Sequence, residues 1–263
     1  MSFSNTGRLV IKIGSSLLTH KGGRPNLRRI DSLSRVISEL KNTGRQVVLV
    51  SSGAIAVGRN RLGMEIRPHE VKLKQAAAAV GQCDLMSHYD RAFSEYGYVA
   101  AQILMNRDIV NNPERKTNVI NTFETLLEMG AVPIVNENDS VAIEELMFGD
   151  NDRLSAIVAT LVHADKLIIL TDIDGFYTCD PRKDQNAHLI ERVEKITPEM
   201  MGGAGNTSSD VGTGGMKTKL EAAALAAKAG IPTIVMSGKD PTALYDVAEG
   251  KSVGTYFCAE EKE

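Results

Sequence analysis

The chain has 263 residues, of which 43% are hydrophobic and 24% are charged, and its formal net charge is −3. This length and composition are ordinary for one globular domain. The small negative charge gives no general attraction to nucleic acid or to an anionic membrane, and the longest apolar runs are far too short to span a bilayer. Three cysteines at wide, motif-free spacing suit a reduced, cytoplasmic chain.

Short apolar runs alternate with helical patterns along the whole chain. We expect strands at 8–13, 46–50, 98–104, 131–135, 166–170 and 231–235. We expect helices at 27–40, 69–96, 113–129, 150–164 and 215–229, with Asn112 and Pro113 at the start of the third. Alternation of strand and helix predicts a mainly parallel sheet that is covered on both faces.

Ligands of such sheets gather beyond the carboxyl ends of the strands, so the residues that follow each strand are the candidates for a site. The segment KIGSS, residues 12–16, follows the first strand. Lys12 and the backbone beside Gly14 could hold an anion, although a solvated lysine next to an ordinary turn is the alternative. The segment SSGAIAVG, residues 51–58, opens into a helix whose first amides also suit an anion, but small residues are common in any tight strand-to-helix turn.

Asn and Asp are concentrated after the fourth strand, in NENDS (136–140) and in GDND (149–152). One interpretation is two turns with capping side chains. In the other, four side chains converge on a polar, partly cationic ligand: Asp139, Asp150, Asn151 and Asp152. The segment TDIDGFYTCDPR (171–182) raises a similar question, because Asp172 at a strand end could accept a hydrogen bond from a nucleotide or simply belong to a turn.

The segment GTGGMKT (212–218) departs from the P-loop pattern, because Met216 stands where that pattern has glycine. No GxGxxG fingerprint is present either, which argues against a dinucleotide site. The loop runs into the predicted helix 215–229, in which a face of small residues would pack against the sheet: Leu220, Ala223, Ala224 and Ala227. Lys217 and Lys219 project in different directions from this helix, and periodicity does not decide which one contacts a ligand.

Six segments together resemble the amino acid kinase family in their order and spacing: KIGSS, SSGAIAVG, NENDSVA, GDNDRLSA, LTDIDGFYTCDPR and GTGGMKTKLEAA. Within that family they are most similar to the glutamate 5-kinases, which phosphorylate L-glutamate at the start of proline synthesis. The resemblance extends from about residue 8 to about residue 256. It implies a three-layer α/β/α sandwich around a mainly parallel open sheet of about eight strands.

The same resemblance implies roles for individual residues. Lys219 matches the functional lysine of the glycine-rich loop and Lys217 a variable position, while Asp152 matches an aspartate that positions Lys12 and Lys219. These three residues are the catalytic candidates. Residues matching glutamate-binding positions are Ser52, Asp139 and Asn151, with Asp150 a neighbour. Residues on the ATP side are Lys12, Thr171, Asp172, Thr213, Gly214, Gly215, Met216, Lys217, Thr218 and Lys219.

The resemblance implies that the chain uses ATP and Mg²⁺, with the metal ion held mainly through nucleotide phosphates rather than by a protein ligand set. The resemblance also implies feedback inhibition by proline and a homo-oligomer, a dimer or a tetramer, without a nucleic-acid or membrane partner. We expect one kinase domain over 1–263, without the RNA-binding-like PUA module that many bacterial glutamate 5-kinases carry. Two alternatives stay open: a related kinase with another acceptor, such as acetylglutamate or uridylate, and a catalytically silent sensor on the same scaffold.

Overall fold

The computed structural model describes residues 7–66, 68–141, 151–179, 181, 184, 186–203 and 215–260. The strands of this part are β1 (Arg8–Ile13), β2 (Gln46–Val50), β3 (Ala100–Met105), β4 (Val132–Glu137), β5 (Lys166–Thr171), β6 (Arg192–Val193), β7 (Thr233–Ser237) and β8 (Thr255–Phe257). Its helices are α1 (Ser15–Leu18), α2 (Leu27–Asn42), α3 (Ala54–Arg61), α4 (Val71–Ser94), α5 (Arg107–Asn111), α6 (Pro113–Glu128), α7 (Asn151–Leu161), α8 (Pro198–Gly203), α9 (Met216–Lys228) and α10 (Ala243–Ala248).

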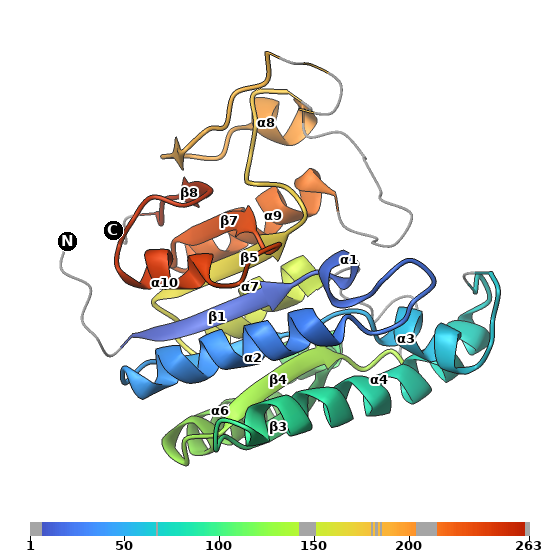
Figure 1. Cartoon of the computed structure of the whole chain (residues 1–263). Helices are drawn as coiled ribbons and strands as arrows, with labels where there is room; N and C mark the ends of the chain where they lie inside the picture. The colour runs from blue at the N-terminus through green and yellow to red at the C-terminus, as the bar shows by residue number, and fades with distance from the viewer. Residues whose placement is uncertain are drawn as a thin grey trace.

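The described strands form one eight-stranded sheet in the order β3-β4-β2-β1-β5-β7-β8-β6 (Figure 1). Neighbouring strands are parallel except for β7 and β8, which run antiparallel. The strand β1 lies between β2 and β5, and Lys12 is in register with Val50 on one side and with Ile169 on the other. The predicted mainly parallel α/β/α sandwich is confirmed. The chain continues from β1 to β2 on one side of the β1–β5 pair and from β5 toward β7 on the other side. The strand order therefore reverses between β1 and β5, and ligands of open α/β sheets bind beyond the carboxyl ends of the strands at such a point.

Each face of the sheet has its own hydrophobic core. Val10 of β1 belongs to the core that also contains buried residues of α6, α7 and α9. Ile11 and Ile13 belong to the core beneath α2, α4 and α10. Side chains alternate between the faces of a strand, so Lys12 lies on the Val10 face, toward α7 and α9.

Local sequence signals explain where the helices begin. The Asn112 side chain accepts a hydrogen bond from the Arg115 amide (3.1 Å), and Pro113 occupies the first turn of α6. Asn26 caps α2 in the same way by accepting from the Arg29 amide (3.2 Å). Both helices therefore begin where the polar caps of the sequence place them.

The helices α3 and α4 cross at two glycines. A Cβ atom at Gly58 would lie 1.7 Å from the carbonyl oxygen of Ala77, and one at Gly81 would lie 1.8 Å from that of Ala54. Only glycine permits so close an approach of two backbones. The start of α3, directly after Ser52 and Gly53, is thereby fixed against α4.

Several details differ from the sequence-based expectations. β4 continues past residue 135 through Asn136 and Glu137, both buried, and the short strands β6 and β8 were not predicted. On α9, Ala224 is only half-buried, whereas Ala222 and Ala226 are fully buried. No described helix is long and apolar enough to cross a membrane.

Candidate active site

The carboxyl end of β1 and the first turns of α7 and α9 bring three charged residues together. Lys12 comes from β1, Asp152 from the second position of α7, and Lys219 from the fourth position of α9. The Lys12 Nζ atom lies 2.5 Å from Asp152 Oδ1, and the Lys219 Nζ atom lies 3.1 Å from Asp152 Oδ2. One carboxylate thus bridges two ammonium groups that are 207 positions apart in the chain (219 − 12).

This charged cluster is buried. Asp152 has no exposed surface, and Lys12 and Lys219 are each 6% exposed. Burial alone would raise the pKa of Asp152, but the ammonium groups of Lys12 and Lys219 outweigh it and hold that pKa well below its usual range. The Thr218 hydroxyl adds a hydrogen bond to Asp152 Oδ2 at 2.8 Å. The aspartate is therefore a fixed anion, unsuited to accept a proton as a general base.

The cluster retains one surplus positive charge, because two ammonium groups share one carboxylate. A buried surplus charge is costly unless an opposite charge joins it. Gly14 lies beside it, since a Cβ atom at that position would be 3.9 Å from Lys12 Nζ. The arrangement suits an anion that reaches both amines from the Gly14 side, such as a phosphate.

Lys217 is separate from this cluster. It is exposed, two positions before the buried Lys219 on the same helix. Two helical positions correspond to a rotation of about 200°, which places the two side chains on opposite sides of α9. Lys219 shares the buried face with the residues three, four and seven positions later, Ala222, Ala223 and Ala226. The structure thus brings Lys219, rather than Lys217, to Asp152.

Asn151, the first residue of α7, connects the charged cluster with a second, polar one. Its Nδ2 atom lies 2.9 Å from Ser52 Oγ, 2.6 Å from the Ser51 carbonyl oxygen and 2.8 Å from Asn136 Oδ1. Because Asn151 and Asp152 are adjacent, the first turn of α7 fixes the distance between the two clusters. A molecule that contacts both would lie across the carboxyl ends of β1, β2 and β4.

Asp139 follows β4, two residues beyond its end, and is half-buried. Burial raises the pKa of Asp139 to about 6. No cationic side chain of the described residues forms an ion pair with it, in contrast to Asp152. A ligand ammonium group placed beside Asp139 would supply the missing charge.

On the predicted ATP side, Thr171 is buried at the end of β5, and its hydroxyl donates to Oδ1 of the exposed Asp172 at 3.2 Å. Gly215 is the N-cap of α9, and Met216 is its first residue. Asp150, Thr213 and Gly214 lie outside the described residues.

Three supporting residues were not predicted. Asn136 accepts from Asn151 and donates from its Nδ2 atom to Gln82 Oε1 at 2.8 Å. Tyr89, fully buried on α4, places its hydroxyl 3.0 Å from the Ser51 hydroxyl. Asn136 could have been found as the first polar residue after an apolar strand, whereas no local signal marks Gln82 or Tyr89. No group of three or more His, Cys, Asp or Glu in the described ranges could hold a metal ion.

Comparison with known proteins identifies the family. The family model described as "Amino acid kinase family" matches residues 7–237. The chain belongs to the amino acid kinase family. Among relatives of this kinase, a glutamate 5-kinase of Clostridium perfringens is 51% identical over 266 aligned positions, which cover 100% of this chain and 99% of the relative. A glutamate 5-kinase of Listeria innocua is 49% identical over alignments covering 100% of this chain and 96% of that protein.

Solved structures share the fold of this amino acid kinase at low sequence identity. The isopentenyl phosphate kinase of T. acidophilum superposes with a TM-score of 0.66 at 17% identity, covering 95% of this chain and 99% of that one. UMP kinase from Bacillus anthracis gives a TM-score of 0.66 at 15% identity, with 97% of each chain covered. At these identities the likeness concerns the fold alone. It agrees with the eight-stranded sheet described above.

Proposed function

We propose that this amino acid kinase transfers the γ-phosphate of ATP to the γ-carboxylate of L-glutamate, giving L-glutamyl 5-phosphate and ADP. The observation that carries the proposal is the buried Asp152 between Lys12 and Lys219, in a chain about half identical over its full length to glutamate 5-kinases. Production of this acyl phosphate is the first step of proline biosynthesis.

The chemistry needs positive charge more than it needs a base. A free γ-carboxylate has a pKa of about 4.3, so at neutral pH it is already an ionised nucleophile. The difficulty is the approach of this anion to the phosphates of ATP. Lys12 and Lys219 stabilise the charge of the transferring phosphoryl group, and Asp152 positions both amines and limits their mutual repulsion.

The polar cluster around Asn151, at the same end of α7 as Asp152, binds the amino acid in this proposal. Ser52 and Asn151 provide the hydroxyl and amide for its polar groups, and Asp139 provides the carboxylate for its ammonium group. The ammonium contact distinguishes an amino acid from a plain dicarboxylate. Thr171, Asp172 and the segment 213–219 are proposed for the nucleotide, on the far side of the lysines.

We propose that magnesium is held at this site through the nucleotide. Asp152, the carboxylate of the charged cluster, is already engaged by two ammonium groups and a hydroxyl, and the described residues form no metal-binding cluster. The ion, bound to phosphate oxygens, would add positive charge for phosphoryl transfer. Lys12 and Lys219 supply the protein's share of that charge.

The proposal is tested by trapping the acyl phosphate with hydroxylamine and by measuring ADP release in parallel, because phosphorylated UMP would be a phosphoanhydride that gives no hydroxamate. ATP and Mg²⁺ are supplied with L-glutamate, N-acetylglutamate, aspartate or UMP as the acceptor. We expect hydroxamate with L-glutamate and at least about tenfold less turnover of the others, since N-acetylglutamate and UMP lack the ammonium group for the charge-assisted contact and the side chain of aspartate is one methylene shorter. Efficient turnover of N-acetylglutamate or UMP would reassign the acceptor. Lack of turnover with every acceptor would instead favour a silent sensor.

Three further properties are proposed from the family resemblance: a cytoplasmic location, inhibition by proline and assembly into a dimer or a tetramer. The same assay with added proline tests the inhibition, and light scattering of the purified chain tests the assembly. Unchanged turnover in the presence of proline would remove the feedback proposal without affecting the kinase assignment.

A further inference from the structure

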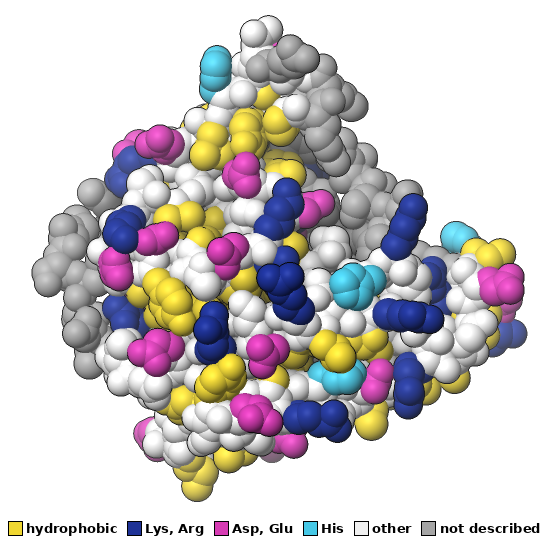
Figure 2. All heavy atoms as spheres, in the orientation of Figure 1, with side chains coloured by type: hydrophobic (Ala, Val, Ile, Leu, Met, Phe, Trp, Pro, Cys, Tyr) yellow, Lys and Arg dark blue, Asp and Glu magenta, His cyan; other side chains and the backbone are white. Residues whose placement is uncertain are grey.

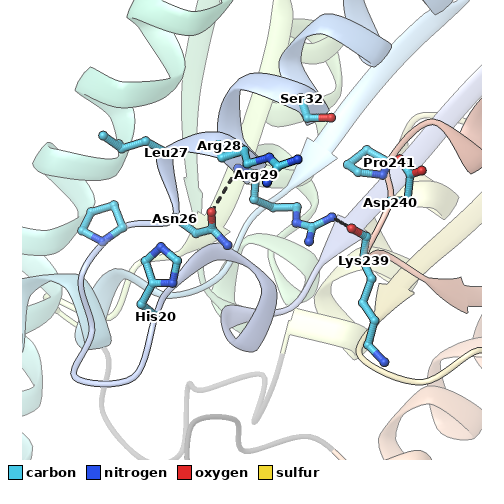
Figure 3. Close-up of a pocket in the computed structure, with 10 residues that line it drawn as sticks. His20, Asn26, Leu27, Arg28, Arg29, Ser32, Lys239, Asp240 and Pro241 are labelled. Atoms are coloured by element: carbon cyan, nitrogen blue, oxygen red, sulfur yellow. Dashed lines mark hydrogen bonds between the residues drawn. The ribbon is translucent and has the colours of Figure 1, made fainter.

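A second pocket lies away from the charged cluster. A cavity of about 800 Å³ is lined by residues of the α1–α2 loop, the start of α2 and the loop after β7 (Figure 3). This volume lies within the range of small-molecule sites. Figure 3 shows Arg28 and Arg29 entering from α2, opposite Lys239 and Asp240.

The pocket is on the other face of the sheet from Asp152. The helices α2 and α10, which flank it, pack on the core that contains Ile11 and Ile13. Lys12 projects to the opposite face, where it meets residues of α7 and α9. A molecule in the pocket therefore does not occupy the space between Lys12 and Lys219.

The pocket carries surplus positive charge. Among the described residues, three cationic ones line it, Arg28, Arg29 and Lys239, against one carboxylate, Asp240, which leaves two positive charges. The side chains of Arg28 and Lys239 are exposed and form no hydrogen bond or ion pair with any other described residue. On the face shown in Figure 2, several Lys and Arg side chains and a histidine gather over the region where α1 and α2 begin.

Asp240 and Arg29 are held in place by their neighbours. The Asp240 carboxylate accepts from the Thr242 amide at 3.0 Å and from the Thr242 hydroxyl at 2.7 Å. Arg29 donates through Nη1 to the carbonyl oxygens of Gly238 (2.8 Å) and Lys239, which joins the two walls of the pocket. Its Nε atom is buried and has no hydrogen-bond partner among the described residues. Arg28 and Lys239 remain as the cations that can move onto a ligand.

The remaining lining suits a ligand with an organic part. Pro25 and Leu27 border the pocket on one side and Pro241 on the other, and the side chain of Leu27 is 56% exposed. The start of α2, a helix of 16 residues, adds the positive end of its dipole. Apolar walls around a few converging charges are typical of ligand sites.

We infer that this pocket is a second anion site, which binds a small organic molecule through a phosphate or carboxylate group held by Arg28 and Lys239. The inference concerns binding alone and is independent of the acceptor that the kinase uses. Both chemistries present the same oxygen acceptors to Arg and Lys, so the experiment has one arm for each.

The test is calorimetric titration of the full chain with inorganic phosphate in one arm and citrate in the other, at constant ionic strength. Four proteins are compared: the unaltered chain, Arg28→Ala/Lys239→Ala, the matched control Lys195→Ala/Lys228→Ala, and Lys219→Met. The control removes two exposed lysines that do not line the pocket, one after β6 and one at the end of α9. Lys219→Met perturbs the charged cluster instead.

We expect at least one probe to bind the unaltered chain, and its dissociation constant to rise about tenfold or more in Arg28→Ala/Lys239→Ala, because two charge-assisted contacts are lost. The control and Lys219→Met should retain the affinity. Binding of phosphate alone would indicate a phosphate-bearing ligand, and binding of citrate alone a carboxylate. No binding of either probe, equal loss in the two double variants, or loss confined to Lys219→Met would overturn the inference.

Discussion

The two aspartates of the candidate site, Asp152 and Asp139, have opposite electrostatic environments. Both are removed from water, which by itself raises the pKa of a carboxyl group. Lys12 and Lys219 reverse this effect at Asp152 and hold its pKa well below the usual range, whereas the pKa of Asp139 rises to about 6. The carboxylate of Asp152 therefore has cationic partners from the chain itself, whereas that of Asp139 has none among the described residues.

This difference suggests that Asp152 has a structural role and that Asp139 has a ligand-binding role. Asp152 already has both of its cationic partners before any substrate arrives, so it fixes their geometry. Asp139 lacks such cations among the described residues, so it gains most when a ligand brings one. A depressed pKa therefore marks the residue that positions the lysines, and a raised one marks the residue proposed for substrate. Each prediction below tests one side of this contrast.

The largest effect is expected from Asp152→Asn, which leaves two buried ammonium groups without a carboxylate. Breaking a buried ion pair on one side costs about 3–5 kcal/mol, and we expect a loss of that order in the free energy of unfolding by urea, together with a large fall in kcat. The stabilisation by Asp152 is present above its ordinary pKa and is lost as the pH falls toward the lower pKa of the folded state.

A control for this variant is Glu221→Ala, which removes an exposed carboxylate from α9. Its effect on stability should stay within about 0.5 kcal/mol. Equal stabilities of Asp152→Asn and the unaltered chain would show that the cluster is not electrostatically coupled.

The next effect is catalytic and compares the two lysines of α9. Lys219→Ala should lower kcat by about 10²–10³, the loss typical of one group that stabilises transition-state charge. Lys217→Ala should change kcat only slightly, because Lys217 is exposed and away from Asp152. Steady-state rates with saturating ATP and glutamate measure both. An inactive Lys217 variant beside an active Lys219 variant would reverse the assignment.

A smaller effect is expected on substrate affinity. Asp139→Asn should raise the KM for glutamate about tenfold or more while leaving kcat nearly unchanged, since one charge-assisted contact is lost. In the unaltered chain this KM should also rise as the pH falls below about 6, where Asp139 becomes protonated. The variant has no carboxylate to titrate, so its KM should be flat over the same interval. Parallel pH profiles would exclude Asp139 from the ammonium contact.

The smallest effect is on stability, and its sign is opposite to that of Asp152→Asn. A raised pKa means that ionised Asp139 destabilises the free protein, a cost that is absent below its ordinary pKa, grows as the pH rises from there toward about 6 and is fully present above about 6. Asp139→Asn should therefore stabilise the ligand-free chain by about 1 kcal/mol at pH 8 and have no such effect near pH 4. Melting temperatures at the two pH values measure this difference. A loss of stability at pH 8 would contradict it.

The framework of the fold could be predicted from residue patterns. The apolar runs that became β1 and β2 were located without error, and the cap formed by Asn112 and Pro113 placed the start of α6. The strands β6 and β8 have only two and three residues, too few for a period to show. β4 extends into Asn136 and Glu137 because these buried residues stay paired with Leu104 and Met105 of β3, so pairing and burial, rather than polarity, decide where that strand ends.

The site could be predicted only in part. The place of Lys12 at a strand end made it a candidate beside the alternative of a solvated lysine, and helical periodicity left Lys217 and Lys219 open, so the family resemblance was needed to choose among them. The face of α9 that we expected to pack against the sheet included Ala224, which lies on the side of Lys217. The structure instead buries Ala222 and Ala226, which lie on the same side of the helix as Lys219. Gln82 and Tyr89 come from α4, distant in sequence, so their contacts depend on tertiary packing.

The touching backbones of α3 and α4 restrict how the acceptor pocket could be redesigned. A methyl group at Gly81 would meet the carbonyl oxygen of Ala54, just two residues after Ser52, and one at Gly58 would meet α4. A side chain at Gly58 or at Gly81 would push α3 away from α4 and would thereby move Ser52, although neither glycine is itself proposed to contact a ligand. A protein engineer who wishes to admit a bulkier acceptor should therefore leave this helical joint intact and vary the half-buried segment near Asp139.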